Sequence, residues 1–126
     1  MIVGLGSDLV DVGRFRRAVE RHGDGFLEGL FSAGEIGACR RKRRCTEHLA
    51  ALFAAREAAL KALGTGLVEG MSWKDMEVLP GPVAGVYRMR LDGAVGLAAT
   101  RLGATSVHLA ITTTREVAGA TVILAA

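Results

Sequence analysis

The sequence predicts an α+β fold in which helices pack on one side of a mainly antiparallel sheet. Helical patterns dominate the first half of the chain, whereas segments that alternate apolar and polar residues dominate the second half. The length of 126 residues suits one compact domain, covering residues 1–126. No internal repeat, linker or low-complexity segment interrupts it.

The first expected element is a strand over residues 2–8. Gly4, Gly6 and Asp8 alternate onto one of its faces, while Leu5 and other apolar residues take the opposite face. Glycine in a strand permits another backbone or a ligand to approach closely. We therefore expect a close neighbour against the glycine-bearing face, which also carries the Asp8 carboxylate.

The helices of the first half are bounded by capping residues. They are expected at residues 12–22, from an Asp11 cap to Gly23; from a Ser32–Glu35 capping box toward residue 44; and at residues 47–63, from Thr46 to Gly64. The second half is expected to hold strands at residues 76–79, 83–91, 107–112 and 117–124, and a helix at residues 93–102. The last two strands predict a hairpin that turns at Arg115-Glu116.

Basic residues are concentrated in two segments, although the net charge is only +3. Arg14, Arg17 and Arg21 share one face of the first helix, and residues 40–44 read Arg-Arg-Lys-Arg-Arg. A basic surface attracts nucleic acid, a phosphorylated cofactor or an acidic protein, and a solvated face is the alternative for residues 40–44. Few aromatic residues accompany that run, so nucleic acid is the least favoured of these partners.

The composition argues against several other classes of protein. No apolar run approaches the length of a transmembrane helix, and the N-terminus lacks the pattern of a signal peptide, so no membrane partner is expected. Cys39 and Cys45 flank the basic run instead of forming a spaced metal pair, which indicates reduced thiols in a cytoplasmic protein. His22, His48 and His108 are scattered, which argues against a zinc site.

Three charged residues stand in apolar surroundings, where a charge is costly unless it is paired or bound to an ion. Asp8 ends an apolar run, and Glu57 and Lys61 lie four residues apart in a helix rich in Ala and Leu. Because that helix is apolar all round, we expect Arg56, Glu57 and Lys61 to be partly buried. Two interpretations stay open: an exposed salt bridge between Glu57 and Lys61, or a site for a divalent cation and a phosphate.

Taken together, these segments resemble holo-acyl-carrier-protein synthases, the small class of 4′-phosphopantetheinyl transferases. The resemblance spans nearly the whole chain and rests on these motifs: Val3-Gly4-Leu5-Gly6-Ser7-Asp8-Leu9 with Arg14-Phe15, Phe31-Ser32-Ala33-Gly34-Glu35, residues 53–66, residues 71–78 and residues 110–123. It implies transfer of 4′-phosphopantetheine from coenzyme A to a serine of an apo acyl carrier protein of fatty-acid or polyketide synthesis, with release of 3′,5′-ADP.

The same resemblance implies roles for individual residues. Asp8 and Glu57 would hold Mg²⁺, and with Lys61 they would form the catalytic set. Contacts to coenzyme A are implied for Arg56, Lys61, Gly64, Thr65, Gly66 and Thr112, and contacts to the acidic carrier for Arg14, Arg17 and Arg21. Family members are homotrimers with the coenzyme A site between subunits, so a homotrimer is expected.

The chain departs from the family pattern at three positions. Leu52 stands in place of an arginine, Arg56 in place of a lysine, and Thr113 in place of a histidine. His108 lies on the opposite strand face and does not replace that histidine. These departures keep a second hypothesis open, a catalytically degenerate module that binds coenzyme A or a carrier protein. The group that accepts the serine proton also stays open.

Overall fold

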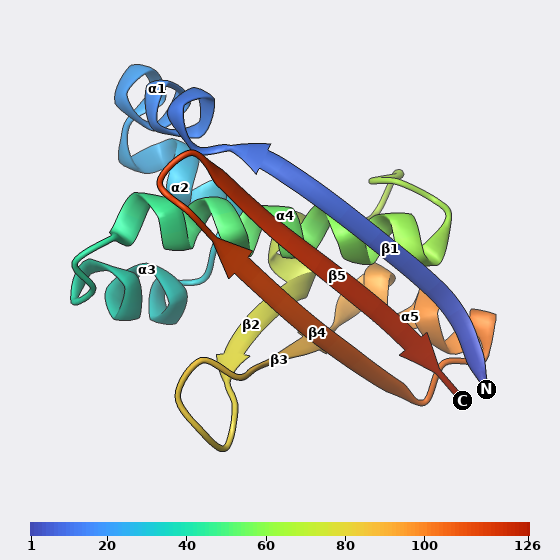
Figure 1. Ribbon diagram of the computed structural model, residues 1–126. Helices are drawn as coiled ribbons and strands as arrows, with labels where there is room; N and C mark the ends of the chain where they lie inside the picture. The colour runs from blue at the N-terminus through green and yellow to red at the C-terminus, as the bar shows by residue number, and fades with distance from the viewer.

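A three-stranded antiparallel sheet, a smaller two-stranded sheet and five α-helices form the computed structural model, which describes residues 1–126 (Figure 1). The elements are β1 (Ile2–Asp11), α1 (Val12–His22), α2 (Asp24–Leu30), α3 (Ala33–Arg40), α4 (Cys45–Leu63), the 3₁₀ turn η1 (Trp73–Asp75), β2 (Met76–Pro80), β3 (Tyr87–Leu91), α5 (Gly93–Leu102), β4 (Ser106–Thr113) and β5 (Val117–Ala125). This arrangement confirms the predicted α+β fold class. None of the helices is long and apolar enough to cross a membrane.

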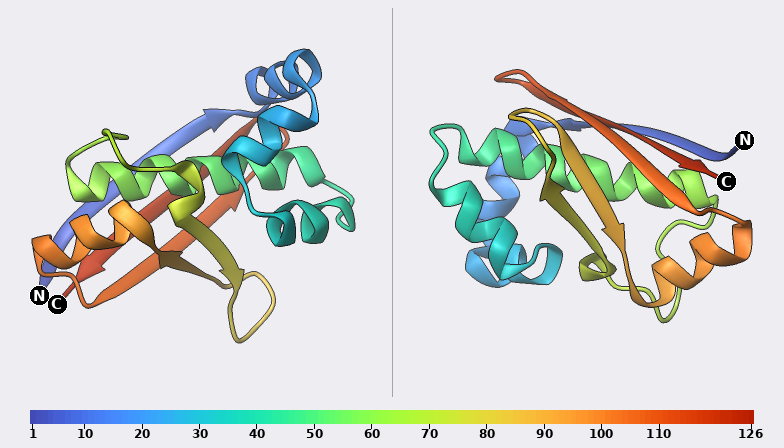
Figure 2. Two further views of the ribbon diagram at one scale, coloured as in Figure 1. Left: turned by 180° about the vertical axis from the view of Figure 1, so that it is seen from behind. Right: turned by 90° about the horizontal axis from the view of Figure 1, so that it is seen from below.

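The main sheet has the strand order β1-β5-β4, and β2 pairs only with β3. β4 and β5 form the predicted hairpin, with Thr112 opposite Gly119, while Asp8 of β1 lies opposite Ala120 of β5. Figure 2 shows the three strands in one layer and the helices, with β2 and β3, in a layer on one side of it. β1 is consequently an edge strand, past which a side chain can project.

α4 is the central helix of the core, and its alanine-rich surface packs against the inner face of β1 and β5. A Cβ added at Gly6 would overlap the carbonyl oxygen of Ala58, and one at Gly4 would overlap that of Ala62. The expected close neighbour of the glycine-bearing face is therefore α4 itself. This contact brings the middle of β1 against the helix that carries Glu57 and Lys61.

The capping predictions are largely confirmed. Asp11 accepts a hydrogen bond from the Arg14 backbone N–H at 2.9 Å, and Ser32 and Glu35 form a complete capping box. Gly64 ends α4 in the left-handed conformation, with φ of 77°. Thr46 was the wrong cap, because α4 begins at Cys45 and no side chain caps its first turn.

Two further segments differ from expectation. The strand predicted at residues 83–91 begins only at Tyr87, because residues 81–86 turn back on themselves and Gly81 N–H donates to the Val86 carbonyl at 2.8 Å. α2 was not predicted, since Gly25 and Gly29 give it a low helix propensity. It forms because Leu27 and Leu30 are buried in the core, where packing outweighs propensity.

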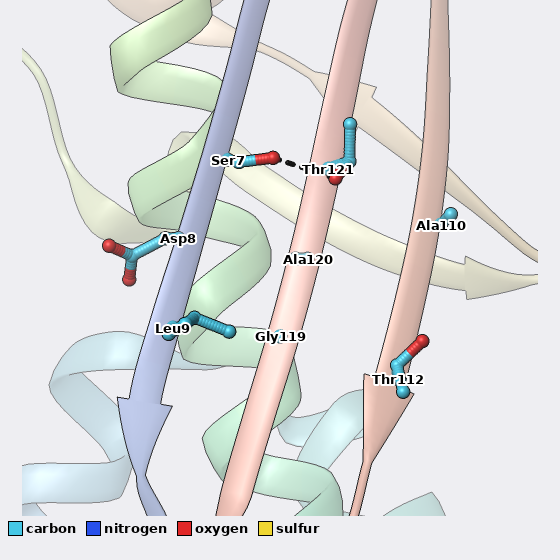
Figure 3. A pocket seen from close by; sticks show the side chains of 8 residues that line it. All are labelled: Ser7, Asp8, Leu9, Ala110, Thr112, Gly119, Ala120 and Thr121. Atoms are coloured by element: carbon cyan, nitrogen blue, oxygen red, sulfur yellow. Dashed lines mark hydrogen bonds between the residues drawn. The ribbon is translucent and has the colours of Figure 1, made fainter.

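The outer face of the main sheet carries no helix. Leu5 and Leu9 point outward from β1 and are 61% and 76% exposed. A shallow hollow of about 410 Å³ crosses this face, and Figure 3 shows the eight residues that line it. Small residues such as Gly119 and Ala110 form its floor, so the face is partly hollow because its side chains are short.

Candidate active site

Asp8 and Glu57 line one hollow of about 430 Å³. Asp8 lies on the edge strand β1, and its carboxylate points away from β5 and β4 (Figure 3). Glu57 reaches the hollow from α4, and the remaining walls come from β1, α1, α2 and α4: Leu9, Val10, Asp11, Arg14, Phe15, Ala18, Phe26 and Phe53. The fold thus brings together the two carboxylates that the sequence singled out.

Lys61 is bound to Asp8 and not to its helical neighbour. Its Nζ lies 2.9 Å from Asp8 Oδ1 and donates a second hydrogen bond to the Ser7 carbonyl oxygen at 3.0 Å. No ion pair joins Glu57 to Lys61, so the interpretation as a salt bridge between them is wrong. The expectation of burial is also wrong for Lys61, whose side chain is 55% exposed, whereas that of Asp8 is 17% exposed.

Glu57 lines this hollow without an ion-pair partner. Burial raises its pKa above the ordinary value of 4.5, the nearby Asp8 charge raises it further, and Lys61 acts in the opposite direction. With Asp11, Arg14 and Lys61 nearby, three carboxylates face two cations, so the Asp8–Glu57 pair lies in an excess of negative charge when the acids are ionised. Such a pair suits Mg²⁺, which takes one or two protein carboxylates and completes its shell with water and substrate phosphates.

Arg56 requires a correction, because it is buried within the core and faces no hollow. Its side chain is inaccessible to solvent and donates hydrogen bonds to Glu35, to the Trp73 carbonyl oxygen and to the Leu52 carbonyl oxygen. The Phe31 ring lies 4.8 Å from its guanidinium carbon. With its donors engaged in this way, Arg56 cannot contact coenzyme A as the sequence predicted.

The acceptor of this ion pair, Glu35, is equally well satisfied. It is almost fully buried, and its carboxylate accepts from the backbone N–H groups of Ser32 and Val78 as well as from Arg56. The sequence showed Glu35 only as a capping-box residue, and no local signal links it to a residue 21 positions away. The pair joins α3, α4 and β2, which is a structural role.

Two other groups of predicted coenzyme A contacts lie outside the carboxylate hollow. Gly64, Thr65 and Gly66 form the C-terminal end of α4, and Thr65 lines a separate apolar hollow beside α5. Thr112 stands on the outer face of β4, and β5 lies between it and β1 (Figure 3). Within one chain, neither group joins Glu57, although Thr112 shares the outer-face hollow with Asp8. The contacts of both groups with coenzyme A stay a prediction.

Arg14, Arg17 and Arg21 form the predicted basic face of α1. With Ala18 and His22 they line a hollow of about 250 Å³. Arg14 and Ala18 also line the carboxylate hollow, so the basic face borders the candidate site directly. On another side of the molecule, the basic run contributes Arg43 and Arg44 to a polar hollow that is completed by Arg16, Glu47 and Arg115.

An aromatic wall was not recognised as part of the site from the sequence. The ring centroids of Phe15 and Phe53 lie 6.0 Å apart, those of Phe15 and Phe26 lie 6.2 Å apart, and Trp73 packs on Phe53 at 5.3 Å. Phe15 follows Arg14 in the chain, and Phe53 begins the motif of residues 53–66. Their places in these motifs were the sequence signal that could have identified them as site residues. No sequence signal marked Phe26 as a site residue, because α2 was itself not predicted.

Comparison with known proteins places this fold and site in a defined class. Residues 4–114 match the family model of the 4′-phosphopantetheinyl transferase superfamily, and the chain belongs to that superfamily. Its curated relatives are holo-(acyl-carrier-protein) synthases. Those of Koribacter versatilis (strain Ellin345) and Methylobacterium radiotolerans are 41% and 44% identical, over 98% and 100% of this chain and 98% and 95% of theirs.

Solved structures agree with this assignment. The crystal structure of holo-(acyl-carrier-protein) synthase from Neisseria meningitidis matches with a TM-score of 0.88 and 25% identity, and the match covers 100% of both chains. The Bacillus anthracis enzyme, crystallised in complex with CoA (3′,5′-ADP), matches with a TM-score of 0.79 and 30% identity, over 98% of this chain and 96% of that one. The resemblance seen in the sequence motifs is confirmed.

Proposed function

We propose that this chain transfers the 4′-phosphopantetheine group of coenzyme A to a serine of an apo acyl carrier protein. The observation that carries the proposal is the hollow that joins Asp8 and Glu57, with Lys61 bound to Asp8 and a basic helix face alongside. The relatives named for this activity match nearly the full chain, which supports it. The serine oxygen attacks the β-phosphorus, the bond to the bridging oxygen breaks, and 3′,5′-ADP leaves.

The chemistry of the donor set assigns parts to the three residues. Asp8 and Glu57 would hold Mg²⁺, which when bound supplies positive charge that neutralises and orients the pyrophosphate. Lys61 is half exposed, lies against Asp8, and supplies a second, protein-borne positive charge for the leaving group. The Helicobacter pylori synthase crystallised in complex with coenzyme A supports coenzyme A as the donor.

The carrier protein is assigned to the basic face of α1. Carriers of this class are acidic, and Arg14, Arg17 and Arg21 are all exposed on that face. Because Arg14 also lines the carboxylate hollow, a carrier held there would present its serine close to Asp8 and Glu57. The surface that binds the carrier would then be continuous with the hollow that holds Asp8 and Glu57.

We further propose that the outer face of the main sheet is covered by other copies of the chain in a homotrimer. The exposed Leu5 and Leu9 and the hollow over Gly119 and Ala110 form a face without a covering layer. Such an assembly would bring Thr112 of one subunit toward the carboxylates of its neighbour. That would account for the separation of the predicted coenzyme A contacts within a single chain.

Intact-mass spectrometry of a purified apo acyl carrier protein, incubated with this protein, coenzyme A and Mg²⁺, tests the transfer. The expected result is a mass gain of one phosphopantetheine group that EDTA abolishes. If several carriers gain no mass while coenzyme A still binds, the chain is instead the non-catalytic module. Of the three changed positions, that outcome would trace to Thr113, because Leu52 and Arg56 are both buried in the core.

A further inference from the structure

The contacts of Lys61 identify a second function for this residue. Its ammonium lies against Asp8 Oδ1 and the Ser7 carbonyl oxygen. We propose that Lys61 is an internal counter-ion that occupies the Asp8 carboxylate until a divalent cation displaces it, after which the freed ammonium is available to the phosphates of coenzyme A. This inference rests on the proposed function, in which Asp8 and Glu57 hold that cation.

The need for a counter-ion follows from the burial of Asp8. With a side chain only 17% exposed, its carboxylate loses much of its hydration and requires a partner. Lys61 supplies that partner from the last turn of α4, one helical turn beyond Glu57. Glu57 has no such partner, so Lys61 satisfies one of the two carboxylates and leaves the other unpaired.

The geometry also keeps the free-energy cost of displacing Lys61 from Asp8 low. The Lys61 side chain is 55% exposed, so its ammonium can return to water without opening the core. Because the lysine end of the pair is exposed, breaking the pair leaves no buried ammonium, and the cation takes over the neutralisation of the Asp8 carboxylate. A divalent cation that binds both carboxylates gains more than one ammonium does at a single carboxylate, because it carries twice the charge and also reaches Glu57.

Displacement of this kind couples the two ligands of the site. Metal binding releases a positive charge that coenzyme A can use, so the metal should strengthen coenzyme A binding. Reciprocity then requires coenzyme A to strengthen metal binding by the same factor. The lysine would convert two independent binding events into one cooperative event, and in the absence of metal it would hold its ammonium away from the phosphates.

The first test titrates Mn²⁺ alone into the full-length protein, with free Mn²⁺ measured by electron paramagnetic resonance. Lys61→Met removes the competing ammonium and should tighten Mn²⁺ binding about fivefold, the equivalent of a surface pair worth about 1 kcal/mol. Lys74→Met is the matched control, since Lys74 is exposed and forms no ion pair, and its affinity should equal that of the wild type. Circular dichroism checks that each variant is folded.

The second test measures coenzyme A affinity by calorimetry with and without Mn²⁺. The metal should strengthen binding to the wild type and have a smaller effect on Lys61→Met, while Lys61→Arg, which keeps the charge, should retain most of the coupling. Mn²⁺ affinity that is unchanged or weaker in Lys61→Met would overturn the counter-ion role and leave the transferase proposal intact. Absence of Mn²⁺ binding to any of the proteins would overturn both this role and the metal assignment.

Discussion

At the scale of single residues, the site depends on how each charge is paired. Asp8 is paired with Lys61, Arg56 with Glu35, and Glu57 with no cation. An unpaired, partly buried carboxylate destabilises the fold while it is ionised, whereas a buried, fully hydrogen-bonded pair is costly to break. Removing the Glu57 charge should therefore stabilise the fold, whereas removing the Arg56 charge should destabilise it.

Glu57→Gln should stabilise the fold at neutral pH. Burial and Asp8 raise the pKa of Glu57 in the folded chain above 4.5, so the stability linked to its protonated form is fully present below pH 4.5 and is lost as pH rises through the folded-state pKa. The advantage of Glu57→Gln should therefore be seen at pH 7 and disappear below pH 4.5. Urea unfolding across this pH range measures it.

Exposed Glu28 provides the control, because Glu28→Gln should change stability at pH 7 by no more than about 0.5 kcal/mol. The same Glu57→Gln protein should lose transferase activity by at least about 100-fold, because loss of even an outer-shell partner of a metal typically costs 10–100-fold. A Glu57→Gln protein that is less stable than the wild type at pH 7 would contradict this account of the carboxylate.

Arg56→Met should destabilise the protein by about 3–5 kcal/mol, because it leaves Glu35 buried without its cation. Arg56→Lys keeps the charge but not the planar fork that serves three acceptors, so it should cost less. Urea denaturation gives both values, and adding Glu35→Gln to Arg56→Met should recover part of the loss. Full stability in Arg56→Met, combined with weakened coenzyme A binding, would restore the role first predicted for Arg56.

At the scale of elements, the contact between β1 and α4 assembles the site. The glycines of β1 allow the strand to lie directly on α4, which places Asp8 within reach of Lys61. The helix α1 then follows β1 without a linker and carries the basic face past the hollow. The β1–α4 contact thus brings together the two proposed metal ligands, and the helix that follows β1 carries the proposed partner surface.

Gly6→Ala should cost at least about 1–3 kcal/mol, because the added methyl overlaps the Ala58 carbonyl and the strand must move away from α4. The matched change Gly25→Ala meets open space in α2 and should stabilise slightly, since alanine is the better helix former. Thermal unfolding of the two variants gives the comparison. Equal stability for both would mean that the close approach is unimportant.

Charge reversal on α1 should weaken the carrier interaction. The double variant Arg17→Glu/Arg21→Glu is expected to raise the KM for the acyl carrier protein roughly tenfold at low salt, with coenzyme A affinity unchanged. Arg88→Glu/Arg101→Glu makes the same change in net charge at exposed positions on β3 and α5 and should have little effect. Equal KM values for the two double variants would show that the α1 face is only a solvated surface.

At the scale of the whole molecule, the two faces of the main sheet differ in what covers them. The inner face is covered by α4, and the outer face is open and carries Leu5 and Leu9. Because Thr112 lies on that open face, assembly and completion of the site are expected to depend on the same surface.

Leu9→Asp should abolish the proposed homotrimer, because it places a charge on the exposed apolar part of the outer face that Leu5 and Leu9 form. Analytical ultracentrifugation is expected to show trimers for the wild type and monomers for this variant, with transfer lost in parallel. Leu97→Asp introduces the same charge at an exposed leucine of α5 and should leave the assembly unchanged. A wild-type protein that sediments as a monomer would refute the trimer.

Most elements of the fold could be predicted because their signals are local. Caps such as Asp11 and Gly64 act within one helical turn, and the alternation in β4 and β5 reports a face within one strand. Asp8, Glu57 and Lys61 stood out for the same reason, since each is a charge among apolar neighbours along the chain. Where packing outweighed local propensity, as in α2, prediction failed.

The pairing of those charges lay beyond the sequence. Lys61 pairs with Asp8 across the β1–α4 contact and not with Glu57 one turn away, and Arg56 pairs with a carboxylate 21 residues earlier. Spacing identifies which charges share a helix face, but packing decides which of them lose water and come within hydrogen-bond distance. Several residues far apart in the chain could pair with each charged group. Which of them does so depends on where α3, β1 and α4 contact one another.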